Sequence, residues 1–266
     1  MRAGRTPLTG IFNTLTMQYN ISELAQMIDH SLLHPTMTDE DLEQGCKVAI
    51  EYGTASVCIK PYAVAKCTGW LKGTGVLVCT VIGFPHGSQT TAIKVAETKE
   101  ACELGATEID MVANIGKVLS GDWNYVEDEI RQINAEAVRH GSILKVIFEN
   151  DYLKDAHKIK LCQICSAIPV AFVKTSTGYG YTKGDDGKFS TKGATADDCK
   201  LMLAHVVPGV QVKAAGGIRS LDELMAMKAL GVTRIGATAT AAIIEEAKRR
   251  NGQASKTTTS GDPSGY

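Results

Sequence analysis

The chain has 266 residues, of which 44% are hydrophobic and 21% are charged, and its formal net charge is -1. This size and composition suit one large globular domain, or two small ones, with a sizeable core. The near-zero charge gives no reason to expect nucleic acid or an anionic membrane surface as a partner. No apolar stretch approaches the roughly 20 residues that span a bilayer, so we expect no membrane-spanning segment.

The two ends of the chain differ in composition from the middle. Residues 1–21 carry Arg2, Arg5 and several threonines but no acidic residue, and they lack both the long arginine-rich face of a transit peptide and the apolar core of a secretory signal. We interpret them as a flexible leader. Residues 251–266 are rich in glycine, serine and threonine, which predicts a flexible tail that ends at Tyr266. The folded domain is therefore expected at residues 22–250.

Strand-like and helix-like patterns alternate through this domain. A short helix is expected at residues 22–25, and longer helices follow at 39–52, 62–71, 91–104, 125–140, 155–167, 195–205, after Ser220 and at 241–250. Apolar strand patterns lie between them, at residues 27–33, 55–59, 76–82, 107–114, 144–149, 169–174, 210–214 and 234–237. Thr38 is suited to cap the first long helix, and Gly53 is suited to end it.

The strand patterns are short and largely apolar on both faces, which indicates a parallel sheet covered by helices. About eight strand–helix units in roughly 230 residues fit a closed barrel better than an open doubly wound sheet. No repeat or linker indicates a second domain. We therefore predict an α/β fold, a single (β/α)₈ TIM barrel with a short N-terminal helix and a flexible C-terminal tail.

Eight cysteines are scattered through these helix and strand patterns and do not frame short loops: Cys46, Cys58, Cys67, Cys79, Cys102, Cys162, Cys165 and Cys199. We interpret them as reduced, mostly buried thiols, and we expect a cytoplasmic protein. Cys162 and Cys165 form a C-x-x-C pair, but it lies within a helical pattern and has no second pair, so a zinc or redox site is not expected there.

The predicted sixth strand carries a single lysine, Lys174, near its end. Lysine is rarely buried, and burial disfavours the ammonium form and favours a neutral, nucleophilic amine. Such an amine can form a Schiff base with a carbonyl substrate. The alternative is a lysine at the edge of the strand whose ammonium group reaches solvent.

Other charged residues interrupt apolar strands that neighbour this one. Asp110 lies between large apolar residues of the fourth strand, and Lys213 lies within the seventh. Active residues of such barrels lie at the C-terminal strand ends, where Lys213 would favour the neutral form of Lys174 by repulsion and Asp110 would relay protons. The alternative is a purely structural Lys–Asp–Lys network, because buried charges need partners. On the fifth strand, Lys145 and Glu149 share a face and are interpreted as a structural ion pair.

Glycines follow the last two predicted strands. Gly216 and Gly217 end the seventh strand, and Gly236, Ala237 and Thr238 end the eighth just before a helix. The loops after the seventh and eighth strands, together with a helix N-terminus, commonly form the phosphate site of such barrels. The sequence therefore predicts a phosphate-binding site in these two loops.

These residues and the runs around them resemble the deoxyribose-phosphate aldolase family. The resemblance spans about residues 27 to 247 and rests on residues 28–33 (IDHSLL), 57–59 (VCI), 81–85 (VIGFP), 108–112 (EIDMV), 144–147 (LKVI), 172–178 (FVKTSTG), 213–219 (KAAGGIR) and 234–237 (RIGA). The Lys-Thr-Ser-Thr-Gly and Lys-Ala-Ala-Gly-Gly-Ile-Arg runs are the most specific of these.

The resemblance implies a role for individual residues. Lys174 is implied as the imine-forming lysine, Lys213 as the lysine beside it and Asp110 as the proton-transfer acid. The implied substrate-binding residues are Asp29, Cys58, Thr177, Gly178, Gly216, Gly217, Gly236, Ala237 and Thr238. Some family members also end in a tail that closes on a C-terminal tyrosine thought to assist proton transfer, which implies a catalytic part for Tyr266.

The implied activity is that of a class I aldolase. It would cleave 2-deoxyribose 5-phosphate reversibly to glyceraldehyde 3-phosphate and acetaldehyde, with no cofactor and no metal, and we expect a homodimer or homotetramer. One alternative is another lysine-dependent barrel aldolase that acts on a different sugar phosphate. A second is a catalytically silent barrel that binds sugar phosphate without forming an imine.

The sequence departs from the family pattern in three places. Residues 179–192 form an inserted loop, and loops of this length are usually functional or disordered. Tyr179 stands where some members have a lysine thought to touch phosphate, and Thr238 stands where the family often has serine. The phosphate contacts are therefore the part of the site that the resemblance specifies least.

Overall fold

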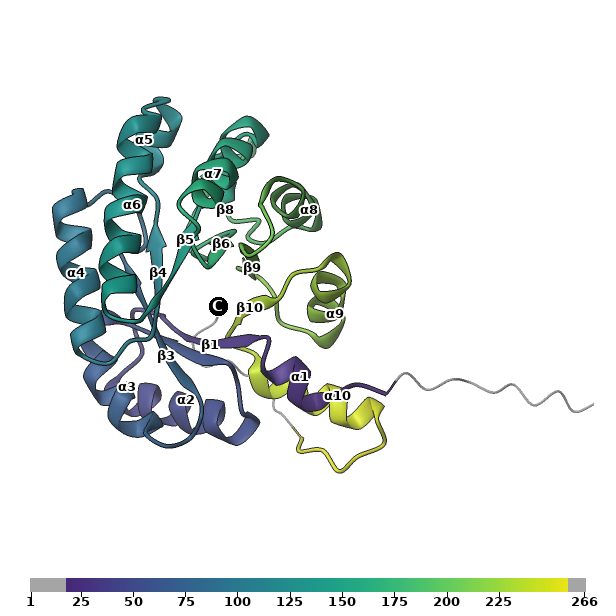
Figure 1. The fold of residues 1–266 in the computed structure, drawn as a ribbon. Helices are drawn as coiled ribbons and strands as arrows, with labels where there is room; N and C mark the ends of the chain where they lie inside the picture. The colour runs from purple at the N-terminus through teal and green to yellow at the C-terminus, as the bar shows by residue number, and fades with distance from the viewer. Residues whose placement is uncertain (1–17, 258–266) are drawn as a thin grey trace, which may run out of the picture.

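The structure is a computed structural model that describes residues 18–257. Most of the expected leader lies outside the described residues, and so does Tyr266. Eight parallel strands close into a barrel in the order β1-β10-β9-β6-β5-β4-β3-β2, and the long helices surround it (Figure 1). The predicted (β/α)₈ barrel is therefore confirmed.

The barrel strands agree with the eight predicted ones to within a few residues. They are β1 (Ile28–Leu32), β2 (Ser56–Ile59), β3 (Leu77–Ile82), β4 (Glu108–Val112), β5 (Ile143–Ile147), β6 (Phe172–Lys174), β9 (Gln211–Ala215) and β10 (Arg234–Ala237).

The helices on the outside are α1 (Ile21–Ala25), α2 (Asp39–Tyr52), α3 (Val64–Leu71), α4 (Thr91–Glu103), α5 (Ile115–Leu119), α6 (Trp123–Arg139), α7 (Asp155–Ala167), α8 (Ala196–His205), α9 (Leu221–Leu230) and α10 (Thr240–Arg250). Two short 3₁₀ turns lie at η1 (Pro61–Ala63) and η2 (Asn150–Tyr152). The sequence analysis did not predict α5.

Local chemistry explains why the helices begin and end where they do. The Thr38 side chain accepts a hydrogen bond from the backbone N–H of Asp41, and the Asp41 carboxylate accepts one from the backbone of Thr38. This reciprocal capping box satisfies two N–H groups that the first helical turn leaves without partners. Gly53 ends α2 at φ 64°, in the left-handed region that favours glycine.

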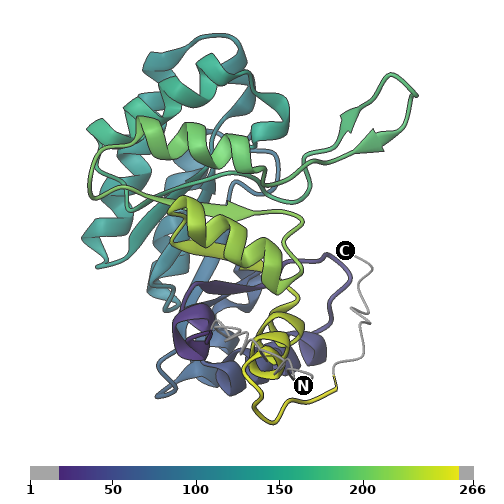
Figure 2. The same ribbon diagram turned by 90° about the vertical axis from the view of Figure 1, so that its right-hand side faces the viewer.

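The inserted loop contains a small hairpin that the sequence did not predict. Its strands are β7 (Thr182–Lys183) and β8 (Phe189–Ser190), which pair antiparallel and are not part of the barrel. Figure 2 shows this hairpin projecting away from the barrel. A strand pattern is recognisable only over about four residues or more, so strands of two residues leave no such signal.

Apolar side chains fill the space between barrel and helices, whereas the barrel interior holds several buried charged residues. All eight cysteines lie in the described part of the chain; they are unpaired, and all but Cys102 are buried. Among residues 18–257, no helix has the length and apolar character needed to cross a bilayer.

Candidate active site

Three strands of the barrel bring Lys174, Lys213 and Asp110 together. Lys174 is the last residue of β6 and pairs in register with Lys213 of β9, while Asp110 lies in β4. Lys174 is only 3% exposed, and the other two are buried as well. The alternative of an edge lysine that reaches solvent is therefore wrong.

One carboxylate oxygen joins the two lysines. Asp110 Oδ2 accepts hydrogen bonds from Lys174 Nζ at 2.8 Å and from Lys213 Nζ at 2.7 Å. Burial by itself would raise the pKa of Asp110, but the neighbouring lysine side chains, that of Lys145 first, hold it well below its usual range. Asp110 is therefore an ionised acceptor that contacts both lysines.

Lys145 belongs to this cluster, and its predicted pairing with Glu149 is wrong. Its Nζ lies 2.8 Å from Asp110 Oδ1, 2.6 Å from Glu108 Oε2 and 3.3 Å from Asp29 Oδ2, all inside the barrel. Asp110 and Lys145 are register partners of β4 and β5, which the sequence alone did not reveal.

Glu149 lies just beyond β5, where the chain has left the strand at φ 58°. Its carboxylate accepts hydrogen bonds from the backbone N–H of Thr177, at 3.2 Å, and from the Thr177 hydroxyl. Burial raises the pKa of Glu149, although these hydrogen bonds oppose the rise. The role of Glu149 in the structure is to hold the chain that follows Lys174.

Asp29 extends the cluster to β1. It accepts hydrogen bonds from Ser56 Oγ at 2.7 Å, from Arg234 Nη1 at 2.5 Å and from Lys213 Nζ. Burial by itself would raise the pKa of Asp29, but nearby cations, chiefly those of Lys145 and Lys213, hold it far below its usual range. Asp29 is therefore an ionised partner of Lys213.

Lys145 and Lys213, two of the three lysines that contact Asp110, are protonated. Burial by itself would lower the pKa of Lys145 and of Lys213, but the Asp110 and Asp29 carboxylates raise both above the ordinary lysine value. These two amines therefore contribute charge and hydrogen bonds to the site rather than nucleophilicity.

Glu108 and Arg234 complete the interior, and sequence reasoning missed both. Arg234 Nη1 lies 3.0 Å from Glu108 Oε2, and its guanidinium carbon lies 5.3 Å from the centre of the Phe172 ring. A signal was available for Glu108: it precedes Asp110 by two residues, and alternate residues of a strand share a face.

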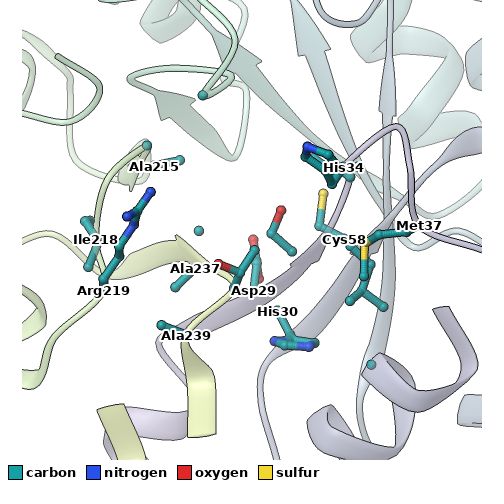
Figure 3. Close-up of a pocket in the computed structure, with 18 of the residues that line it drawn as sticks. Asp29, His30, His34, Met37, Cys58, Ala215, Ile218, Arg219, Ala237 and Ala239 are labelled. Atoms are coloured by element: carbon teal, nitrogen blue, oxygen red, sulfur yellow. The ribbon is translucent and has the colours of Figure 1, made fainter. Parts of the chain in front are cut away.

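A cavity of about 590 Å³ opens beside Lys174. The sequence-predicted residues that line it are Asp29, Cys58, Lys174, Thr177, Gly178, Lys213, Gly216, Gly217, Gly236, Ala237 and Thr238. Asp110 contacts the two lysines but is not part of the lining. In Figure 3, Ile218, Arg219 and Ala237 lie on one side of the pocket, and His34, Met37 and Cys58 lie on the other.

The two glycine loops form the first of these sides. Gly216 and Gly217 have φ values of 94° and 85°, which side chains rarely tolerate. Gly193, at the end of the insertion, packs directly behind them, because a Cβ on it would lie 2.4 Å from the carbonyl oxygen of Gly216. Backbone N–H groups and the start of α10, beside the Arg219 side chain, make this side suitable for an anion.

Both ends of the inserted loop contact the site. Tyr179 lines the cavity and meets Phe84 edge to face, with ring centres 5.5 Å apart. At the other end, Asp151 Oδ2 accepts hydrogen bonds from Thr191 Oγ1 at 2.6 Å and from the backbone N–H of Gly193 at 3.2 Å. The insertion is thus anchored to the rim of the pocket at its base, while its hairpin projects outward (Figure 2).

Two groups of potential metal ligands occur in the described part of the chain: Cys58, Cys79 and Asp110, and Asp29, Cys79 and Glu108. The Lys145 ammonium contacts Asp29, Glu108 and Asp110 and lies 3.2 Å from Cys79 Sγ. The Lys145 ammonium group therefore already supplies a positive charge to the three carboxylates that would otherwise bind a cation.

Comparisons with known proteins agree with this geometry. Residues 23–247 match the model of the DeoC/LacD family aldolases. The chain is 49% identical to a deoxyribose-phosphate aldolase of Rhodopirellula baltica, with 93% of this chain and 99% of that protein covered. It is 46% identical to a deoxyribose-phosphate aldolase of Caldanaerobacter subterraneus, with 89% and 98% covered. Among solved structures, a tetrameric deoxyribose phosphate aldolase of Aeropyrum pernix has a TM-score of 0.76 at 31% identity, with 85% and 92% covered.

Proposed function

The chain belongs to the DeoC/LacD family of aldolases, as its motifs predicted, and we propose that it is a class I aldolase that cleaves 2-deoxyribose 5-phosphate reversibly to glyceraldehyde 3-phosphate and acetaldehyde. The observation that carries this proposal is the single Asp110 oxygen bonded to Lys174 and Lys213 beside a cavity with an anion-binding side.

Lys174 attacks the aldehyde carbon C1 of the open-chain sugar. Its nitrogen forms a carbinolamine, which loses water to give a protonated imine. The imine nitrogen then accepts the electron pair of the C2–C3 bond as that bond breaks and the C3 hydroxyl gives up its proton. Glyceraldehyde 3-phosphate leaves, and an enamine remains on Lys174.

Protonation of the enamine at C2 and addition of water to the resulting imine release acetaldehyde and restore the amine. Asp110 and Lys213 relay these protons, because they share a hydrogen bond and the Asp110 carboxylate contacts the reacting amine. Lys213 also disfavours the ammonium form of Lys174 by repulsion. No step requires a bound metal or organic cofactor, because the imine nitrogen is the electron sink.

The substrate lies across the cavity with its phosphate toward the glycine loops. Backbone N–H groups of Gly216, Gly217 and Gly236–Thr238, with Arg219, bind the phosphate, while Asp29 borders the aldehyde end. Cys58, Thr177 and Gly178 line the remaining wall. The proposal also gives Tyr266, which lies outside the described residues, a part in enamine protonation.

The assembly is a homodimer or homotetramer that acts in the cytoplasm. A tetrameric relative of the same fold supports self-association, and eight unpaired cysteines, seven of them buried, are consistent with a reducing compartment.

Reduction with borohydride in the presence of 2-deoxyribose 5-phosphate tests the proposal. The expected product is a covalent adduct on the peptide that contains Lys174, together with acetaldehyde release before reduction. The Lys174→Arg variant is the matched control and should give no adduct. A wild-type protein that forms no adduct, or forms it only on Lys213, would contradict the proposed role of Lys174; an adduct without acetaldehyde release would indicate a different sugar phosphate.

A further inference from the structure

Seven charged side chains fill the barrel interior among the described residues, and their signs do not balance. Three are carboxylates and four are cations: Asp29, Glu108 and Asp110, and Lys145, Lys174, Lys213 and Arg234. The ion pairs described above link all seven into one network. Buried charges are costly unless each has a counter-charge, so one cation is in excess.

The contacts identify which cation this is. Lys145 contacts three carboxylates, and Lys213 and Arg234 contact two each. Lys174 contacts one, through an oxygen of Asp110 that it shares with Lys213. The other three cations therefore suffice to neutralise the three carboxylates.

We propose that Glu108 and Arg234 are positioning residues that set the protonation state of Lys174 through the charge balance of the barrel interior. This inference rests on the proposed aldolase function, since it concerns the nucleophile of that reaction. Neither side chain contacts Lys174; they act through Lys145, Asp29 and Asp110. With Lys145, Lys213 and Arg234 charged, the neutral amine is the form of Lys174 that leaves the interior without net charge.

The titratable groups around Lys174 include four that are not among the seven counted above, namely Cys58, Cys79, Glu149 and Tyr179. Those that face it from the surrounding elements are Asp29 on β1, Cys58 on β2, Cys79 on β3, Asp110 and Glu108 on β4, Lys145 on β5, Glu149 after β5, Tyr179 after β6, Lys213 on β9 and Arg234 on β10. Glu149 is hydrogen-bonded to Thr177 and is not changed in any variant considered below. It therefore cannot make the acidic limb of the pH–rate profile move in opposite directions in different variants.

Single-charge variants test the inference by the sign of their effect. Arg234→Met leaves one carboxylate without a cation, which favours protonated Lys174. The acidic limb of the profile of kcat/KM against pH should therefore move to higher pH, by on the order of one unit. Glu108→Gln removes a carboxylate and should move the same limb downward. The double variant restores the balance, so its limb should return near the wild-type position.

Matched controls separate this effect from ordinary packing loss. Lys94 and Glu129 form a buried ion pair of 2.8 Å between α4 and α6, outside the barrel interior, and Lys94→Met and Glu129→Gln should not shift the limb. Arg234→Lys keeps the charge and should also leave the limb in place. If Arg234→Met fails to fold, Arg234→Gln, which keeps a hydrogen-bond donor, is expected to show the same upward shift.

The outcomes distinguish this inference from the proposed function. A wild-type protein that forms no imine refutes the proposed function itself. Normal imine formation in the wild type, combined with folded Arg234 and Glu108 variants whose limbs do not move or move in the same direction, would overturn the charge-balance inference alone.

Discussion

Replacement of Lys213 by leucine is expected to move the acidic limb of the pH–rate profile to higher pH, by about two units. Lys174 Nζ and Lys213 Nζ lie 2.8 and 2.7 Å from the same oxygen of Asp110. The two nitrogens are therefore at most about 5.5 Å apart, and unit charges at that distance repel by about 3 kcal/mol at an effective dielectric constant of about 20. One pH unit corresponds to about 1.36 kcal/mol, which gives the expected shift.

The assay is kcat/KM for 2-deoxyribose 5-phosphate as a function of pH, with acetaldehyde coupled to NADH oxidation by alcohol dehydrogenase. The acidic limb of this profile reports the ionisation of the free enzyme. Lys213→Arg retains the charge and should shift the limb much less. Lys94→Leu removes a different buried lysine, paired with Glu129 at 2.8 Å, and serves as the control for general destabilisation.

A folded Lys213→Leu variant with an unshifted limb and an unchanged maximal rate would refute the electrostatic role of Lys213 and reduce it to packing or phosphate binding. A limb displaced to lower pH would refute the sign of the argument, because removal of a positive neighbour cannot favour loss of a proton. A reduced maximal rate without a shift would indicate that Lys213 acts only as a proton relay.

Four further predictions concern the other proposed site residues and the acid stability of the fold. Lys174→Arg should abolish cleavage while the circular dichroism spectrum stays unchanged, because the guanidinium remains protonated and forms no imine; substantial turnover would move the nucleophile elsewhere. Asp110→Asn should still form the borohydride-trapped adduct, more slowly, but hydrogen exchange at the acetaldehyde methyl group, followed by NMR in D₂O, should nearly stop; wild-type exchange would contradict a relay through Asp110. Tyr266→Phe should lower kcat more than it changes KM, because a hydroxyl that acts in the chemical step contributes little to binding; equal turnover and exchange would remove Tyr266 from the mechanism. The pKa values of Asp29 and Asp110 are held below the ordinary aspartate value of 3.8, so the stability they contribute should be complete above about pH 4 and lost as the pH falls below it. A melting temperature that stays constant from about pH 5 to about pH 2 would contradict their ionised state.

The sequence by itself determined the architecture of this chain. Helix caps such as Thr38 and Gly53, and apolar strands at regular intervals, are local signals, and they suffice because neighbouring elements of a (β/α)₈ barrel are also neighbours in the chain. The same local reasoning identified Lys174 and Lys213, since a lysine within an apolar strand is unusual wherever the strand lies.

Only the tertiary structure decided which charges meet inside the barrel. The sequence analysis paired Lys145 with Glu149, which shares a face of the predicted strand. Lys145 instead contacts Asp110, because the register between β4 and β5 sets Lys145 opposite Asp110. Arg234 and Glu108 are 126 positions apart and meet only because the barrel closes. Strand register and closure arise from the packing of the whole sheet, so no short segment encodes such contacts.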